Sequence, residues 1–212
     1  FSNIKKQKDI KGFTLIELIV AMAIFISIIT IATGALFSAQ AINARLEQSQ
    51  TILDGINLTM EVISREVRYG SIFYCGNIIP PPLNSSRNSC VYGGGGGNVL
   101  TFKPSTKLAT TDNNVDQTLD RIVFYLSNGI IYKDEYAGGK VSNKKTYQIT
   151  PNDAKIDSFR FFVSGAESSS SFDFDQPLVT IIISGVTIPK KTTIIPVSFN
   201  VQTSVSSRAL DN

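Results

Sequence analysis

The sequence predicts an α+β fold in which one long N-terminal helix packs on an antiparallel β-sheet. Residues 13–37 form an apolar run whose only charged residue is Glu17, and an apolar stripe at helical spacing extends this run to Val67. Short segments with alternating apolar and polar residues follow, separated by turn-forming residues. One long helix followed by several short strands is typical of an α+β domain, with one face of the helix covering the sheet.

The apolar run is long enough to cross a membrane, because about 20 residues rising about 1.5 Å each span the hydrocarbon core. A carboxylate such as Glu17 within a membrane-spanning segment is costly unless it is paired, so it marks a function. A secretory signal has a shorter apolar core with its small-residue cleavage site after it. Here the small residue, Gly12, precedes the run, so cleavage there leaves the helix in the product. An uncleaved signal anchor is the alternative.

The polar leader, residues 1–12, accounts for the net charge of the chain. Its charged residues give a net charge of +3, equal to that of the whole chain, and they are Lys5, Lys6, Lys8, Lys11 and Asp9. The rest of the chain is therefore neutral overall, and we expect no nucleic-acid partner. A basic leader next to an apolar helix predicts a single-pass membrane protein with a cytoplasmic N-terminus and an extracytoplasmic C-terminal domain.

The helix is expected to run from Phe13 to Tyr69 and to stop at Gly70. We assign residues 38–70 to an amphipathic half that belongs to the globular domain. Two helices joined near Gly34 or Gly55 are the alternative. The apolar stripe that the domain is expected to cover is Ile42, Leu46, Ser49, Leu53, Ile56, Met60, Ile63 and Val67.

Residues 71–212 are expected to form one extracytoplasmic β-rich domain, a size usual for a single domain. Its first part, residues 71–97, is rich in Pro, Asn, Ser and Gly and predicts a loop. Asn128-Gly129 predicts a tight hairpin turn, and the tail after Ser206 is expected to be frayed. The expected strands are residues 99–103, 121–126, 130–134, 145–149, 159–163, 179–183 and 195–201.

The only cysteines, Cys75 and Cys90, flank a proline-rich stretch. An exported domain occupies a compartment that permits disulfides, so we expect a bridge between them. In the chain-entropy model a loop of this size stabilises a domain by roughly 3 kcal/mol. Two free thiols are the alternative, and the spacing matches no zinc motif.

Composition and motifs argue against catalysis. The chain has no histidine and no Gly-x-Ser-x-Gly elbow, so the common nucleophile and base arrangements are missing. The glycines of residues 93–97 lack the lysine and hydroxyl residue of a phosphate loop. Asp173 and Asp175 are too few for a calcium site, and residues 112–116 have a similarly weak claim. We therefore expect a non-enzyme without catalytic residues, metal or cofactor.

The junction between the leader and the helix resembles the type IV prepilin signature, through Lys11-Gly12-Phe13-Thr14-Leu15-Ile16-Glu17-Leu18. The resemblance implies a pilin-like fold, cleavage by a prepilin peptidase between Gly12 and Phe13, and N-methylation of Phe13. It also implies assembly with other pilin or pseudopilin subunits on an inner-membrane platform, starting from the lipid bilayer. Glu17 would pair with the Phe13 amine of a neighbouring subunit, which satisfies both charges.

Further segments are similar to those of minor subunits, the J-type pseudopilins and PilW-like minor pilins. These segments are residues 60–68, residues 120–125 and the Asn128-Gly129 turn. One departure is Gly34, which stands where many major pilins have a helix-weakening proline. The resemblance implies a structural subunit that is incorporated in, or initiates, a filament for a pilus, type II secretion or DNA uptake. A signal-anchored binding or enzymatic domain that never polymerises is the alternative.

Overall fold

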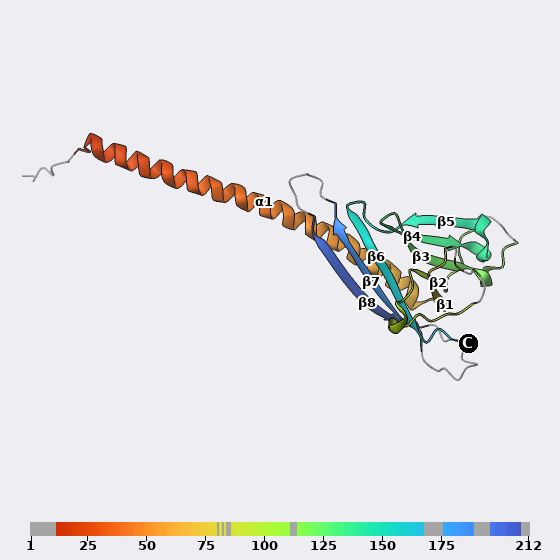
Figure 1. Ribbon diagram of the computed structural model, residues 1–212. Coiled ribbons are helices and arrows are strands. Elements are labelled where there is room, and N and C mark those ends of the chain that lie inside the picture. The colour runs from red at the N-terminus through yellow and green to blue at the C-terminus, as the bar shows by residue number, and fades with distance from the viewer. Residues whose placement is uncertain are drawn as a thin grey trace, which may run out of the picture. The chain divides into compact units, whose positions relative to one another are not determined.

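The structure is a computed structural model that describes residues 12–79, 81, 83, 86–110, 114–167, 176–188 and 196–208. Helix α1 (Leu15–Arg68) comes first, and the strands follow it (Figure 1). Contacts between residues group the chain into two compact units, Phe1–Glu47 and Gln48–Asn212, which are described separately below. One uninterrupted helix is thus found where a helix was expected over residues 13–69. The functional boundaries after residues 12, 37 and 70 stay predictions.

The described residues of the second unit form two antiparallel sheets rather than the single sheet expected. The first sheet has the order β1-β2-β3-β4-β5 and the second has the order β6-β7-β8 (Figure 1). Alternating apolar residues identify strands but carry no information on how many sheets those strands form. The strands are β1 (Ser71–Gly76), β2 (Val99–Lys103), β3 (Arg121–Ser127), β4 (Ile130–Tyr136), β5 (Lys144–Gln148), β6 (Ala154–Ser164), β7 (Leu178–Thr187) and β8 (Ser198–Ser206).

The last part of α1 supplies one wall of the core. Its buried apolar residues, each at most 5% exposed, are Ile52, Ile56, Met60, Ile63 and Val67. The expected stripe began at Ile42, but Ile42 and Leu46 are 57% and 55% exposed. Leu53 is also exposed, and the neighbouring Ile52 is buried in its place. The prediction was wrong there because a stripe at helical spacing does not show where its cover begins.

Both sheets contribute to the same core cluster as α1. In the first sheet, the ring of Phe102 lies 5.5 Å from that of Phe73 and 6.0 Å from that of Phe124, centroid to centroid. In the second sheet, Phe159 and Phe161 pack edge to face with centroids 4.4 Å apart. Aromatic rings bury large apolar areas, so this cluster is a main source of stability for the unit.

Strand β1 corrects the expectation of a loop over residues 71–97. Phe73 and Cys75 are fully buried and alternate with partly buried neighbours, which is the pattern of a strand. Ile72 has a φ of 55°, and the register between β1 and β2 shifts between Ser71 and Tyr74. The irregular start and the glycine- and proline-rich residues that follow hid a short strand within a composition typical of loops.

The C-terminal strand and tail also differ from expectation. Strand β8 keeps the expected alternation but extends to Ser206, and Ile195 lies outside the described residues. The tail is not frayed immediately after Ser206. The Ser207 hydroxyl donates to the Gly70 carbonyl at 2.7 Å, and the Arg208 amide donates to the Arg68 carbonyl at 2.7 Å. These bonds satisfy carbonyls at the end of α1, which would otherwise lack partners.

The expected hairpin between β3 and β4 is confirmed. Asn128 and Gly129 have φ angles of 51° and 78°, as a two-residue turn with left-handed backbone requires. The turn fixes the register, in which Ser127 pairs with Ile130 and Arg121 pairs with Tyr136.

Candidate functional site

The N-terminus of α1 is closed by a reciprocal cap between Thr14 and Glu17. The Thr14 hydroxyl accepts from the Glu17 amide at 3.4 Å, while Glu17 Oε2 accepts from the Thr14 amide at 3.3 Å and from its hydroxyl at 3.2 Å. The first helical bond, from the Leu18 amide to the Thr14 carbonyl, is 3.3 Å long. This is the capping-box arrangement, in which a hydroxyl residue and a glutamate three residues later satisfy helix amides for each other.

The cap gives Glu17 local partners within an otherwise apolar segment. A carboxylate at the first turn is also stabilised by the partial positive charge of the helix N-terminus, typically by about 0.3–1 kcal/mol. Sequence reasoning identified Glu17 but overlooked Thr14. The Thr-x-x-Glu spacing preceding an apolar run was the signal that indicates both residues.

Up to Phe37, helix α1 is apolar on all sides apart from Glu17. Every described side chain from residue 12 to residue 47 is exposed, including Phe13 at 82% and Ile31 at 74%. Within the described part of the chain, α1 is the one helix long and apolar enough to cross a membrane. Glu17 shares an open groove on this surface with Phe13, Ile16, Val20, Ala21 and Ile24. The carboxylate therefore sits beside the residue expected to become the new N-terminus.

The hydroxyl groups of this segment are satisfied within the helix. Ser27, Thr30 and Thr33 donate to the carbonyls of Ala23, Ile26 and Ile29, four residues earlier, at 2.8–2.9 Å. A hydroxyl that donates a hydrogen bond to its own helix costs less free energy to transfer from water into hydrocarbon. The segment is thus compatible with an apolar environment despite these polar residues.

The expected cleavage residues lie just before the helix. Gly12 and Phe13 are exposed and precede α1, so the bond between them is outside the hydrogen-bonded helix. The leader before Gly12 lies outside the described residues. Cleavage at this bond, methylation of Phe13 and pairing of Glu17 with a neighbouring subunit stay predictions.

The two cysteines are joined in a disulfide, with their Cα atoms 5.7 Å apart. Cys75 belongs to β1, whereas Cys90 exchanges backbone hydrogen bonds with Val163 of β6 at 2.9 and 3.0 Å. The disulfide therefore connects the edge strand of the first sheet to a segment that pairs with the second sheet.

A buried carboxylate, Asp134 on β4, organises the far edge of the first sheet. It is 2% exposed and accepts hydrogen bonds from Thr146 at 2.6 Å, Lys144 at 3.2 Å and Tyr136 at 3.3 Å. Burial, followed by the charge of Asp134, raises the pKa of Tyr136 and that of Tyr125 to about 12. Both tyrosines stay protonated near neutral pH, and the cluster joins β4 to β5.

A second charged cluster ties α1 to the first sheet. Lys133 Nζ lies 2.8 Å from Glu66 Oε1 on α1 and 2.9 Å from Glu135 Oε1 on β4. Burial alone lowers the pKa of Lys133, but the hydrogen bonds and charges of the two glutamates outweigh it, so the pKa is raised above its ordinary value.

Most of the residues considered as calcium ligands are not described by the structure. Asp173, Asp175, Asp112 and Asn113 lie outside the described residues. Among the residues that are described, no group of three or more acidic, histidine or cysteine side chains is placed to hold a metal.

Comparison with known proteins identifies the N-terminal segment. Residues 7–37 match the family model of the prokaryotic N-terminal methylation motif. The chain carries a prepilin-type methylation motif. Cleavage and methylation motifs of this type support a type IV pilin-like protein that is anchored in a membrane, processed by a prepilin peptidase and assembled with other pilins. Comparisons with curated proteins and with solved structures return no match. The motif covers only the leader and the first part of α1. One long N-terminal helix with antiparallel sheets is a pilin-like α+β architecture.

Proposed function

We propose that the chain is a structural subunit of a type IV pilus-like filament and that it has no catalytic activity of its own. Processing between Gly12 and Phe13 frees the amine of Phe13, which is then N-methylated. The Glu17 carboxylate pairs with the Phe13 amine of a neighbouring subunit. The apolar part of α1 passes from lipid into the filament core, where the helices of other subunits replace the bilayer.

The position of Glu17 carries this proposal. It is the only charged residue among residues 13–37, and it lies in the exposed groove beside Phe13. Among the described residues of the monomer, the carboxylate accepts only the long hydrogen bonds from Thr14, between 3.2 and 3.3 Å. A charged amine from a second subunit would form an ion pair with a hydrogen bond of about 2.7–2.9 Å, shorter than these bonds.

The leader supports the direction of insertion. Its net charge of +3 favours a cytoplasmic N-terminus, with the second unit outside the cytoplasm. The disulfide between Cys75 and Cys90 fits that location, because disulfides form and persist in oxidising compartments. The assembly platform of the inner membrane would extract the subunit from the bilayer.

A finer assignment is to the minor subunits, either J-type pseudopilins or PilW-like minor pilins, which are incorporated in or initiate a filament. It rests on the resemblance of residues 60–68 and 120–125. The machine served is a pilus, a type II secretion system or a DNA-uptake system.

Mass spectrometry of the mature N-terminus tests processing directly. A chain that begins at methylated Phe13 is expected, whereas an intact leader would indicate a signal-anchored domain that does not polymerise.

The substitution Glu17→Ala tests assembly. We expect it to abolish recovery of the subunit in sheared filaments, because an unpaired amine would remain buried in the filament core. Glu61→Ala is the matched control, since Glu61 is an exposed glutamate on the same helix, outside the apolar run. Incorporation of the Glu17→Ala subunit at the control level would contradict the proposed pairing.

A further inference from the structure

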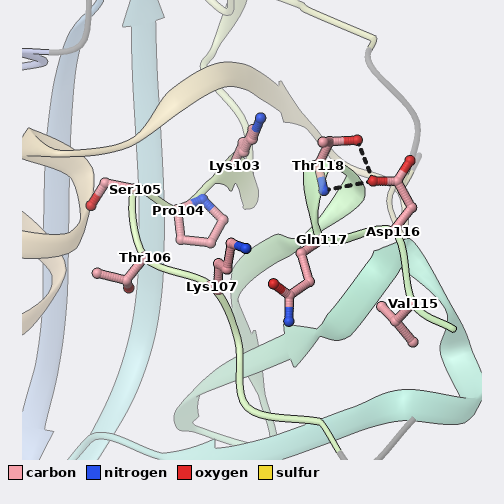
Figure 2. Close-up of a pocket in the computed structure, with 9 residues that line it drawn as sticks. All are labelled: Lys103, Pro104, Ser105, Thr106, Lys107, Val115, Asp116, Gln117 and Thr118. Carbon is pink, nitrogen blue, oxygen red and sulfur yellow. Dashed lines mark hydrogen bonds between the residues drawn. The ribbon is translucent and has the colours of Figure 1, made fainter. Parts of the chain in front are cut away.

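A polar pocket in the second unit contains none of the residues named in the proposed assembly. It occupies about 400 Å³ between the segment that follows β2 and the 3₁₀ turn η2 (Gln117–Leu119) (Figure 2). This volume is within the range usual for small-molecule sites. The lining residues are Lys103, Pro104, Ser105, Thr106, Lys107, Val115, Asp116, Gln117 and Thr118.

Two lysines are among the residues that line this pocket. Lys103, the last residue of β2, is partly buried, and Lys107, in the segment after β2, is exposed (Figure 2). Within the described part of the chain, neither ammonium group forms a hydrogen bond or an ion pair. Two ammonium groups at one cavity make an attractive position for a carboxylate, although the charge of Lys103 also acts on Asp116.

The opposite side of the pocket offers a hydrogen-bond acceptor. Asp116 Oδ1 accepts from the Thr118 amide at 2.9 Å and from the Thr118 hydroxyl at 2.7 Å. These two bonds, with a smaller contribution from the charge of Lys103, hold the pKa of Asp116 below its ordinary value. The carboxylate is therefore ionised near neutral pH. Its second oxygen, Oδ2, accepts no hydrogen bond from the described residues.

The remaining polar groups suit a ligand with several hydroxyls. The Gln117 amide both donates and accepts, and the Ser105 and Thr106 hydroxyls line the same pocket. A phosphate dianion would be drawn to the lysines but repelled by Asp116. A monocarboxylate with hydroxyls fits better, because its charge meets the lysines while its hydroxyls donate to Asp116.

We propose that this pocket binds a hydroxyl-rich monocarboxylate, a sugar acid of the uronate class. Lys103 and Lys107 bind the carboxylate of the ligand, and Asp116 Oδ2 accepts from a ring hydroxyl. The site belongs to the second unit alone, so it does not depend on the proposed role of Glu17.

Titration calorimetry on the full chain in detergent, with glucuronate as the probe, tests the site. Glucose and inorganic phosphate are the matched probes, the first without the carboxylate and the second without ring hydroxyls. We expect saturable binding of glucuronate, and binding of each matched probe that is weaker by about tenfold or more. No saturable glucuronate binding, or phosphate binding of equal affinity, would overturn the proposal.

Variants locate the binding within the molecule. Lys103→Gln with Lys107→Gln should weaken glucuronate binding by about tenfold or more, and Asp116→Asn should weaken it less, because an amide oxygen still accepts a hydrogen bond. Lys155→Gln, an exposed lysine on β6 outside the pocket, should leave binding unchanged. Equal binding by the double lysine variant and by the Lys155→Gln control would place the ligand elsewhere. The comparison of glucuronate with glucose uses the unaltered chain, so its result does not depend on whether the variants fold.

Discussion

The two parts of helix α1 both carry many large apolar residues, but the surroundings of those residues are opposite. Residues 15–47 expose every described side chain, with large apolar residues between 44% and 78% exposed. In the part from Gln48 to Arg68, five apolar residues of one face are at most 5% exposed beneath the sheets. Apolar residues thus serve two different purposes on one helix. The second part is stabilised by its own chain, whereas the first part needs lipid or other subunits.

The difference has an energetic meaning. Fully burying an isoleucine or leucine side chain contributes about 1.5–3 kcal/mol. That contribution stabilises the second unit in the monomer. In the first unit the described side chains are exposed, so under the proposed function the same kind of residue drives membrane insertion and assembly instead of folding.

The sharpest contrast comes from two isoleucine substitutions. Ile63 is fully buried, and Ile63→Ala should destabilise the second unit by about 2–5 kcal/mol, through lost burial and a residual cavity. Ile24 is 56% exposed, so Ile24→Ala should leave the unfolding transition of the second unit unchanged. Thermal unfolding of the full chain in detergent, followed by near-ultraviolet circular dichroism, measures both. Equal destabilisation by the two variants would contradict the claim that only the second part of α1 stabilises the folded unit.

Removing the disulfide should act on the second unit alone. The cysteines are 15 residues apart, so the double substitution Cys75→Ser with Cys90→Ser should cost roughly 3 kcal/mol by loss of the loop constraint. Chemical denaturation monitored by tyrosine fluorescence gives the loss, because the tyrosines lie in the second unit. The helicity of residues 15–47 in detergent should not change, and a parallel loss there would show that the two parts depend on each other.

Substitution of Thr14 in the helix cap provides the corresponding test for the first part of α1. Thr14→Ala should destabilise the first turn of α1 by about 1 kcal/mol, while Thr14→Ser should retain the cap. Hydrogen exchange at the amides of Glu17 and Leu18, measured in detergent micelles, should accelerate about fivefold in Thr14→Ala, the rate equivalent of that energy. The unfolding midpoint of the second unit should stay constant. Unchanged exchange would mean that Thr14 does not close the helix.

The smallest expected effect concerns the ion pair that ties α1 to β4. Lys133 has a folded pKa above its ordinary value of 10.5, so the fold favours its charged form. The stabilisation is complete below that ordinary value and is lost as the pH rises through the higher folded pKa.

We therefore expect Lys133→Met to reduce stability by about 1 kcal/mol near pH 9 and by less near pH 11. The difference in unfolding free energy between the variant and the unaltered chain isolates Lys133 from the tyrosines, which also titrate in this range. Lys155→Met, on β6, serves as the control. A difference that grows with pH would have the wrong sign for this pair.

Much of the fold and the N-terminal signal could be predicted from the sequence. Local spacing predicts the helix, because apolar periodicity and a continuous apolar run depend only on neighbouring residues. Strand β2 and the Asn128-Gly129 turn were predicted for the same reason, since alternation and left-handed turn residues act locally. Residues 11–18 also carry the methylation motif in plain sequence, and the spacing of Thr14 and Glu17 encodes the cap.

Only the tertiary structure decided how those elements pack and which of their residues are buried. Contacts between distant residues split the strands into two sheets, bury Ile52 in place of Leu53 and leave Ile42 exposed. The same kind of contact places Cys90 against Val163 and brings Lys103 opposite Asp116. Hydrophobic burial is non-directional and requires only a cover, so a stripe on a helix cannot specify where that cover begins or whether it comes from the same chain.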